Sequence, residues 1–512
     1  MQLQTDLTIN KLFARTAERC GNCYALQSDK VCLTYEQLDK KISEVACELC
    51  GIGISRGDFV GLYGPNSVSG IILYYALMRI GATAVLLGAG MSAAELEPRI
   101  AAVALKLLCY WGERPCVQTE RQRFDMLNIS ELDVASAETV FSALCRSKPL
   151  SGRIAAPAPD DIDSILFTSG TTGNSKPVAT THFSRSNNAL AQGEALSITS
   201  DDRFCLVLPM HHCFSLSACI LAAMAYGACV CIPDNRRTKT VLKMIQERKC
   251  TALLSVPTYF TSLLNSSDFG SFDVSSLRVG MMGGSMYPAE LFLTTQKKLG
   301  IKLIPSLGQT EATAGFTMGK PDDPDEIAAK TVGYFMEHIE GKLFDPLTGA
   351  EVHSGQIGEI CIRGYNVMKQ YYGLPEETAK ALCGGWLHTG DLGYQDEEGR
   401  VFLAGRKKEL IIKGGENISP WEIERAILID KRVAQAKVIS VPDAHYIEDI
   451  CACIIPCAGA VVTPEEVKAL VSQQLSKNKV PRYVCVFSEF PLNPNGKINA
   501  AELRDRALSI LN

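Results

Sequence analysis

A run of small, hydroxyl-bearing and basic residues, TSGTTGNSK at positions 168–176, is well suited to bind an anion. Its glycines let the backbone curl so that several N–H groups point at one site. Hydroxyl side chains add hydrogen-bond donors, and Lys176 adds a positive charge. The run directly follows the apolar stretch 164–167, which favours a phosphate-binding loop over a flexible linker of similar composition. It is not a Walker A loop, because Ser175-Lys176-Pro177 stands where that motif requires Gly-Lys-Ser/Thr.

Alternating strand-like and helical segments form the scaffold that must position this loop. Strands are expected at 58–63, 82–87, 164–168, 204–208, 228–232, 252–256, 278–282 and 302–306, and helices at 36–50, 71–80 and 238–247. Such alternation predicts parallel sheets with helices on both faces. After about residue 340, shorter strands and frequent turns predict a mostly antiparallel region. From Lys408 onward strand–helix units resume in a smaller piece, behind a hinge between 407 and 415.

The composition excludes several classes of protein. A chain of 512 residues with 46% apolar and 21% charged residues is a globular protein of more than one domain. A net charge of −5 with 7% aromatic residues argues against a nucleic-acid partner. The long uncharged stretch 204–233 is interrupted by proline, histidine and glycine, so no membrane-spanning segment is expected.

Twenty cysteines are numerous for this length. The N-terminus has no apolar signal segment, and free thiols at this density require a reducing compartment, so we expect a cytoplasmic protein. The pairs Cys20/Cys23 and Cys47/Cys50 have the spacing of zinc ligands. The second pair falls on a predicted helix with an apolar stripe, so buried free thiols are the favoured interpretation of both pairs.

The loop at 168–176 resembles the signature loop of the adenylate-forming superfamily, which includes acyl-CoA synthetases, nonribosomal adenylation domains and luciferases. From about Thr34 to the C-terminus, further motifs of that superfamily recur in order: PMHH at 209–212, GGS at 283–285, LGQTE at 307–311, GWLHTGD at 385–391, GRKK at 405–408, KGGEN at 413–417 and PLNPNGK at 491–497. The resemblance implies an α/β fold whose large N-terminal domain, residues 1–407, has two parallel-type α/β sheets and a β-barrel-like antiparallel region. A small mobile α+β C-terminal domain, residues 408–512, would carry the catalytic lysine.

The resemblance also implies roles for individual residues. Catalytic roles fall to Lys497, Glu311, His212 and Thr310, with Glu311 as the Mg²⁺ ligand. ATP binding falls to Thr168, Ser169, Gly170, Thr171, Thr172, Gly173, Lys176, Gly284, Ser285, Leu307, Gly308, Gln309, Thr310, Asp391, Arg406 and Lys497. Within this set, Asp391 would accept hydrogen bonds from both ribose hydroxyls, because a carboxylate has two acceptor oxygens. Leu307 departs from the superfamily, which usually places an aromatic residue there to stack on adenine.

The resemblance implies two further groups of residues, one for the carboxylic acid and one for transfer of the acyl group to coenzyme A. The acyl pocket would contain His212, Met282, Gly283, Gly308 and Ala314. The face that forms the thioester would carry Gly414, Gly415, Glu416 and Asn417, and Lys408 would be the hinge. The pocket segments are mostly small or apolar, which favours an aliphatic or aryl acid over one with a second charge.

These residues predict an ATP-dependent carboxylic acid–CoA ligase that forms acyl-AMP and pyrophosphate, then acyl-CoA and AMP, with ATP, Mg²⁺ and coenzyme A. Two alternatives stay open. One is a stand-alone adenylation enzyme that loads an acyl or aminoacyl group onto a carrier protein's phosphopantetheine. The other is a non-catalytic nucleotide-binding relative. The acid and the oligomeric state are not readable from the sequence.

Overall fold

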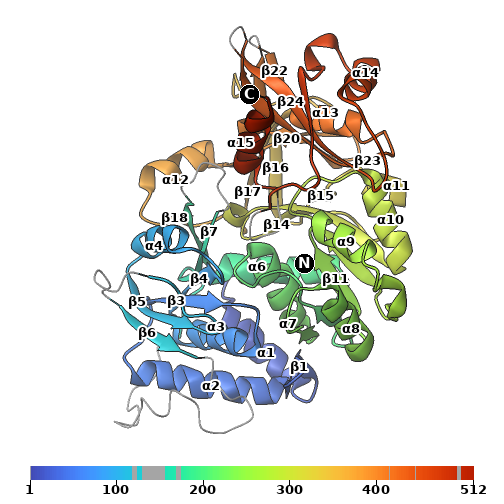
Figure 1. Cartoon of the computed structure of the whole chain (residues 1–512). Helices are drawn as coiled ribbons and strands as arrows, with labels where there is room; N and C mark the ends of the chain where they lie inside the picture. The colour runs from blue at the N-terminus through green and yellow to red at the C-terminus, as the bar shows by residue number, and fades with distance from the viewer. Residues whose placement is uncertain are drawn as a thin grey trace.

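The computed structural model describes residues 2–117, 124–129, 156–168, 175–413, 416–443, 446–492 and 498–511. A large body contains most of the chain, and a smaller body formed by the C-terminal residues lies above it (Figure 1). The largest hydrophobic core is formed by buried side chains between Ile9 and Val401, whereas buried side chains between Ile411 and Val471 form a separate core. The boundary between residues 407 and 408 stays a prediction.

The first large sheet has nine strands and is parallel at its centre. In spatial order its strands are β15 (Tyr334–Phe335), β14 (Gly315–Met318), β13 (Lys302–Gly308), β12 (Val279–Met282), β11 (Ala252–Ser255), β9 (Arg203–Cys205), β10 (Cys229–Cys231), β1 (Tyr24–Gln27) and β2 (Cys32–Thr34). The carboxyl ends of β9, β12 and β13 point the same way, and ligands of open α/β sheets bind at such an edge.

The second large sheet has seven strands, again with a parallel centre. Its order is β18 (Gln370–Tyr371), β8 (Pro177–Thr181), β7 (Ile162–Phe167), β4 (Thr83–Gly88), β3 (Phe59–Gly64), β5 (Leu105–Tyr110) and β6 (Asp125–Asn128). The helix α6 (His182–Ala195) contacts β7 and β8 of this sheet and β14 of the other, so it packs between the two sheets (Figure 1).

Two smaller sheets complete the fold. The antiparallel region is a four-stranded sheet of β16 (Ile339–Phe344), β17 (Gly358–Gly364), β19 (Leu387–Gln395) and β20 (Val401–Arg406). The C-terminal sheet contains β22 (Glu416–Ile418), β21 (Ile411–Lys413), β24 (Ile447–Pro456), β23 (Val433–Asp443) and β25 (Tyr483–Val486). The predicted fold class, with parallel sheets, an antiparallel region and a small α+β part, is confirmed.

The remaining elements are helices. They are α1 (Ile9–Cys20), α2 (Tyr35–Gly51), α3 (Val68–Ile80), α4 (Ala93–Ala101), a π-helix at Phe214–Leu221 continued by α7 (Ala222–Tyr226), α8 (Thr238–Arg248), α9 (Pro257–Leu264), α10 (Ala289–Leu299), α11 (Asp325–Ala328), α12 (Pro375–Ala381), α13 (Pro420–Ile427), α14 (Pro464–Gln474) and α15 (Ala500–Leu511). Short 3₁₀ turns lie at Phe269–Ser271, Thr310–Ala312, Cys383–Gly385, Lys407–Glu409 and Lys477–Lys479.

Local sequence explains where these helices begin and end. Thr34 and Gln37 form a capping box at the start of α2, each side chain bonding the other's backbone N–H. Gly81 ends α3 in the left-handed conformation. The stretch 204–233 forms β9, a loop, the buried π-helix with α7, and β10, as its composition predicts. Among the described residues no helix is both long and apolar enough to cross a membrane.

The cysteine prediction is wrong in part. Cys47 is exposed and Cys23 and Cys50 are half-buried, so only Cys20 of the two CxxC pairs is a buried thiol. Cys47 lies on the exposed side of α2, whereas Cys50 lies at the edge of the buried stripe of Leu38, Ile42, Val45, Ala46 and Leu49 and packs partly against the core. A three-residue ion-binding cluster that includes either pair is absent from the described residues.

Candidate active site

The two ends of the predicted phosphate loop are joined by backbone and hydroxyl hydrogen bonds. β7 and β8 pair antiparallel on either side of the loop, and Thr168 N–H donates to the Lys176 carbonyl at 3.1 Å. The Thr168 hydroxyl accepts from Lys176 N–H at 3.1 Å, and the Ser175 hydroxyl donates to the Thr168 carbonyl. Hydroxyl residues at both ends therefore hold the loop's ends together. Of the predicted contacts, Ser169, Gly170, Thr171, Thr172 and Gly173 lie outside the described residues.

Lys176 is directed by two side chains far away in sequence. Its ammonium lies 2.6 Å from a Glu377 carboxylate oxygen and 4.7 Å from the centre of the Tyr371 ring. Because Lys176 and Lys380 both bond this carboxylate, the pKa of Glu377 is lowered to about 2. Glu377 and Tyr371 therefore hold the Lys176 ammonium at the end of the predicted phosphate loop.

Glu311 lies in the 3₁₀ turn that follows β13. One of its carboxylate oxygens accepts from the Tyr371 hydroxyl at 2.8 Å, and its backbone carbonyl accepts from Met368 N–H at 2.8 Å. Burial, followed by the charge and hydrogen bond of Glu311, raises the pKa of Tyr371. The tyrosine therefore stays a donor and orients the carboxylate.

Asp391 and Arg406 meet across two strands of the antiparallel sheet. They are register partners in β19 and β20, and Arg406 Nε lies 2.7 Å from an Asp391 carboxylate oxygen. Asp391 is buried, and its charge is the largest cause that raises the pKa of Arg406. Burial and the Arg406 charge lower the pKa of Lys408, while Glu311 and Asp391 act in the opposite direction. Four residues from three separate motifs are therefore close enough to interact electrostatically.

The residues predicted for the acyl pocket also come together. His212 is half-buried in the segment that follows β9. The hydroxyl of Thr310 donates to the sulfur of Cys213, the residue after His212, at 3.7 Å. Met282 is buried at the end of β12, and Gly283 lies beside the Phe214 ring. The histidine segment and the Thr310 turn are thus in contact.

Gly308 stands where no side chain fits. A Cβ atom there would lie 2.3 Å from the carbonyl oxygen of Ala314, which accepts from Gln309 N–H at 3.0 Å. Leu307 is buried in β13 immediately before it, whereas Gly284 and Ser285 are exposed. The backbone of the LGQTE motif is therefore tightly folded at Gly308.

Several predicted residues cannot be placed. Gly414, Gly415 and Lys497 lie outside the described residues. Glu416 and Asn417 belong to β22, and only their backbone is described. Figure 1 shows β22 at the end of the small body that is farther from the large one.

Sequence reasoning missed a buried ion pair behind the site. Arg185 of α6 and Asp163 of β7 are fully buried, 2.6 Å apart. Arg185 and Ser217 both donate to the carbonyl of Thr313, at 3.5 and 3.3 Å, and Thr313 has a positive φ of 65°. An acidic residue inside an apolar strand was a usable signal. Tyr371 and Glu377 had no such signal, because only the fold brings them to the site.

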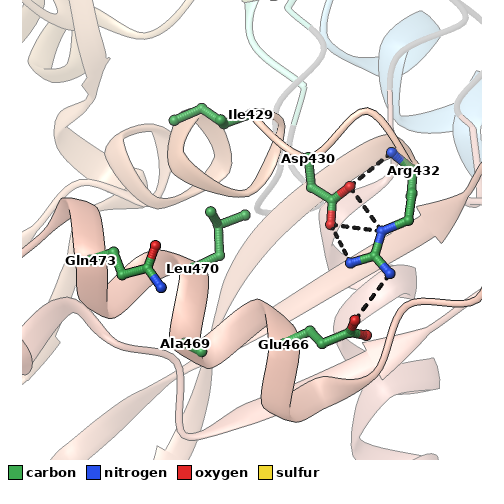
Figure 2. Close-up of a pocket in the computed structure, with 7 residues that line it drawn as sticks. All are labelled: Ile429, Asp430, Arg432, Glu466, Ala469, Leu470 and Gln473. Atoms are coloured by element: carbon green, nitrogen blue, oxygen red, sulfur yellow. Dashed lines mark hydrogen bonds and ion pairs between the residues drawn. The ribbon is translucent and has the colours of Figure 1, made fainter.

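A surface pocket of about 320 Å³ lies elsewhere, in the small body. Figure 2 shows Arg432 between Asp430 and Glu466, with Leu470 and Ile429 beside them. The pocket is formed by the loop that follows α13 and by α14. None of the predicted site residues lines it.

The fold and this arrangement define an enzyme of the adenylate-forming class. The chain belongs to the AMP-binding enzyme family. The family model matches residues 13–372, and the model of the family's C-terminal domain matches residues 422–497. The prediction of an AMP-forming acid–CoA ligase is confirmed at the level of the reaction.

Known acyl-CoA ligases are similar to this protein over nearly the whole chain. The medium-chain acyl-CoA ligase ACSF2, mitochondrial, of Bos taurus is 31% identical, covering 99% of this chain and 89% of its own length. The acyl-CoA ligase sidI of Aspergillus fumigatus is 32% identical, covering 99% and 92%. The solved structure of O-succinylbenzoate coenzyme A synthetase (MenE) from Bacillus subtilis with ATP and magnesium ion is similar, with a TM-score of 0.82, 25% identity and coverage of 96% and 99%.

Proposed function

We propose that this ligase acts on an aliphatic or aryl monocarboxylic acid, uses MgATP and delivers the acyl group to free coenzyme A. The observation that carries the proposal is the meeting of Glu311, Asp391, Arg406 and Lys408 next to the Thr310 turn and the His212 segment. These contacts support a nucleotide-binding group of residues and an apolar-lined group that share the Thr310 turn.

The residues present suit a magnesium ion. Mg²⁺ in nucleotide enzymes binds one or two carboxylates and the substrate's phosphates. Glu311 offers a half-buried carboxylate that Tyr371 already orients. The bound ion would offset phosphate charge. Similarity to the B. subtilis synthetase solved with ATP and magnesium ion supports the use of MgATP.

The chain's own groups would then divide the work of the first step. Attack of a carboxylate on the α-phosphorus brings anions together, so donors must offset charge that builds in the transition state. Thr310 and Lys497 would serve the α-phosphate, Lys176 and the loop at 168–176 the other phosphates, and Asp391 and Arg406 the ribose. His212 would close the acyl side of the Thr310 turn.

The proposed class of acid is based on the residues that line the acyl side of the Thr310 turn. Met282 is buried, Phe214 lies beside Gly283, and Ala314 is buried behind Gly308. These groups suit an apolar acyl chain. The name of the bovine relative, a medium-chain acyl-CoA ligase, supports an aliphatic chain of that class.

The second step would use another face of the small domain. In Figure 1, β22 lies at the end of the small body that is farther from the large one. A swing of the small domain about Lys408 would bring the face that forms the thioester to the site for attack by the CoA thiol. We expect a cytoplasmic enzyme, since most of its many thiols are free and buried.

The test is pyrophosphate release over a panel of carboxylic acids, each with and without CoA. We expect release that depends on a medium-chain or aryl acid, with acyl-CoA and AMP as products. Acyl-AMP that accumulates and never reacts with free CoA would instead identify a carrier-loading enzyme. ATP binding without acid-dependent pyrophosphate release would identify a non-catalytic relative.

A further inference from the structure

Three side chains of the antiparallel sheet bring a sulfur, a nitrogen and a carboxylate oxygen to one point. Cys361 of β17 faces His388 of β19 as its register partner, and their Sγ and Nδ1 atoms are 3.3 Å apart. The same Nδ1 lies 3.3 Å from Oε2 of Glu359, two residues before the cysteine. The three donor atoms all lie within 4.8 Å of one another.

These separations approach those of a tetrahedral zinc site. With metal–ligand bonds of about 2.0–2.3 Å, neighbouring ligands of a tetrahedral ion stand about 3.4–3.6 Å apart. Two of the three edges are already near that value, so a small adjustment of side chains would admit an ion. We propose that Glu359, Cys361 and His388 form a three-ligand site for a soft divalent transition ion of the Zn²⁺ class.

The ligand types separate this site from the magnesium site. Thiolate and imidazole select zinc or cobalt over magnesium, which prefers oxygen ligands only. Glu359 and Cys361 are buried, whereas 32% of the His388 side chain is exposed, so an ion has a route from solvent past the histidine. Three protein ligands leave one position for water.

A lysine competes for the same carboxylate. Lys407 Nζ lies 3.0 Å from Glu359 Oε2, the oxygen that also faces His388. Its side chain is 45% exposed and can move into solvent. On binding, the ion would take the place of the ammonium at Oε2, the Cys361 thiol would release its proton to solvent, and the sulfur would donate an electron pair to the ion.

The other oxygen of Glu359 keeps the site rigid. Oε1 accepts from Gly390 N–H at 3.2 Å, within an irregular part of β19 where Gly390 has a φ of 72°. The Thr389 hydroxyl donates to the Ile360 carbonyl across the same strand pair. These bonds fix the carboxylate on one side, so only Lys407 needs to leave when an ion binds.

The test is a Zn²⁺ titration against a chromophoric chelator, together with Co²⁺ spectra, on the full chain without ATP, acid or CoA. The readout therefore does not depend on the enzyme's reaction. We expect one ion per chain at this site, with a sulfur-to-cobalt band. Cys361→Ala should weaken binding at least tenfold and remove that band, and Lys407→Met should tighten binding.

Cys219→Ala is the matched control, because Cys219 is an equally buried thiol outside the cluster. It should leave the site's affinity unchanged. His388→Gln provides a second test if Cys361→Ala fails to fold, and it too should weaken binding at least tenfold. Equal affinity in wild type and in folded Cys361→Ala or His388→Gln, or tightening absent in Lys407→Met, would overturn the proposal.

Discussion

The hydroxyl of Tyr371 provides a sharp test of how Glu311 works. Tyr371→Phe removes one donor, at 2.8 Å, from the carboxylate assigned to Mg²⁺. The ring remains, so the contact with the Lys176 ammonium above it is kept. A hydrogen bond to a charged group contributes about 1.5–3 kcal/mol. If the bond orients Glu311 in the transition state, adenylation kcat/KM falls by about 10- to 150-fold.

The assay separates the two half-reactions. Acid-dependent pyrophosphate release is measured over a range of Mg²⁺ concentrations, and thioester formation is measured from supplied acyl-AMP and CoA. Tyr371→Phe should slow the first and raise its Mg²⁺ requirement, while the second stays close to wild type. Tyr372→Phe is the control, because that ring packs on Phe59, with centroids 5.0 Å apart, rather than on Glu311. Wild-type pyrophosphate release by Tyr371→Phe would refute the role assigned to this contact.

The remaining predictions concern the nucleotide, the domain swing and the buried ion pair. Leu307→Tyr should tighten ATP by about 0.5–1.5 kcal/mol through stacking on adenine, and titration showing weaker binding by a folded variant would reject that. Lys497→Ala should abolish acyl-adenylate formation yet still convert supplied acyl-AMP, whereas Lys408→Pro should release pyrophosphate and stall the thioester step. Equal loss of both halves in both variants would exclude alternation. Arg185→Met should lower the free energy of unfolding by about 3–5 kcal/mol, because it leaves Asp163 buried without its partner; urea titration showing a loss below 1 kcal/mol would contradict this.

The same buried pair makes a prediction about pH. Burial is the largest single cause and raises the pKa of Asp163, but Arg185, His182 and hydroxyl donors together hold it below its ordinary value. A carboxyl group whose pKa is lower in the folded than in the unfolded state stabilises the folded protein at pH values above its unfolded pKa, near 3.9. That stabilisation is lost as the pH falls below this value. Urea titrations at pH 7 and pH 3 should show a smaller acid-induced loss for Asp163→Asn than for wild type. An equal loss of stability in wild type and Asp163→Asn would show that Asp163 does not contribute to the pH dependence of stability.

Much of the scaffold followed from local patterns. Apolar runs near 59–64, 83–88 and 302–308 predicted strands within a residue or two of their observed ends, because a strand buried on both faces needs an unbroken apolar run. Strand 204–208 proved shorter, since its chain leaves the sheet after Cys205. The CxxC pair on α2 was misjudged because Cys47 lies on the outer side of the helix, and Cys50, at the edge of the buried stripe, is only half-buried.

The sequence alone determined which chemical groups are present and predicted their use: a loop for phosphate, carboxylates for a cation and ribose, and lysines in two late motifs. These are properties of residue type and order, so they can be read before any folding. Only the tertiary structure decided the partners: Tyr371 on Glu311, Glu377 on Lys176, and the meeting of Glu359, Cys361 and His388. Such contacts arise where strands and helices distant in sequence pack together, and the spacing of residues along the chain carries no record of that packing.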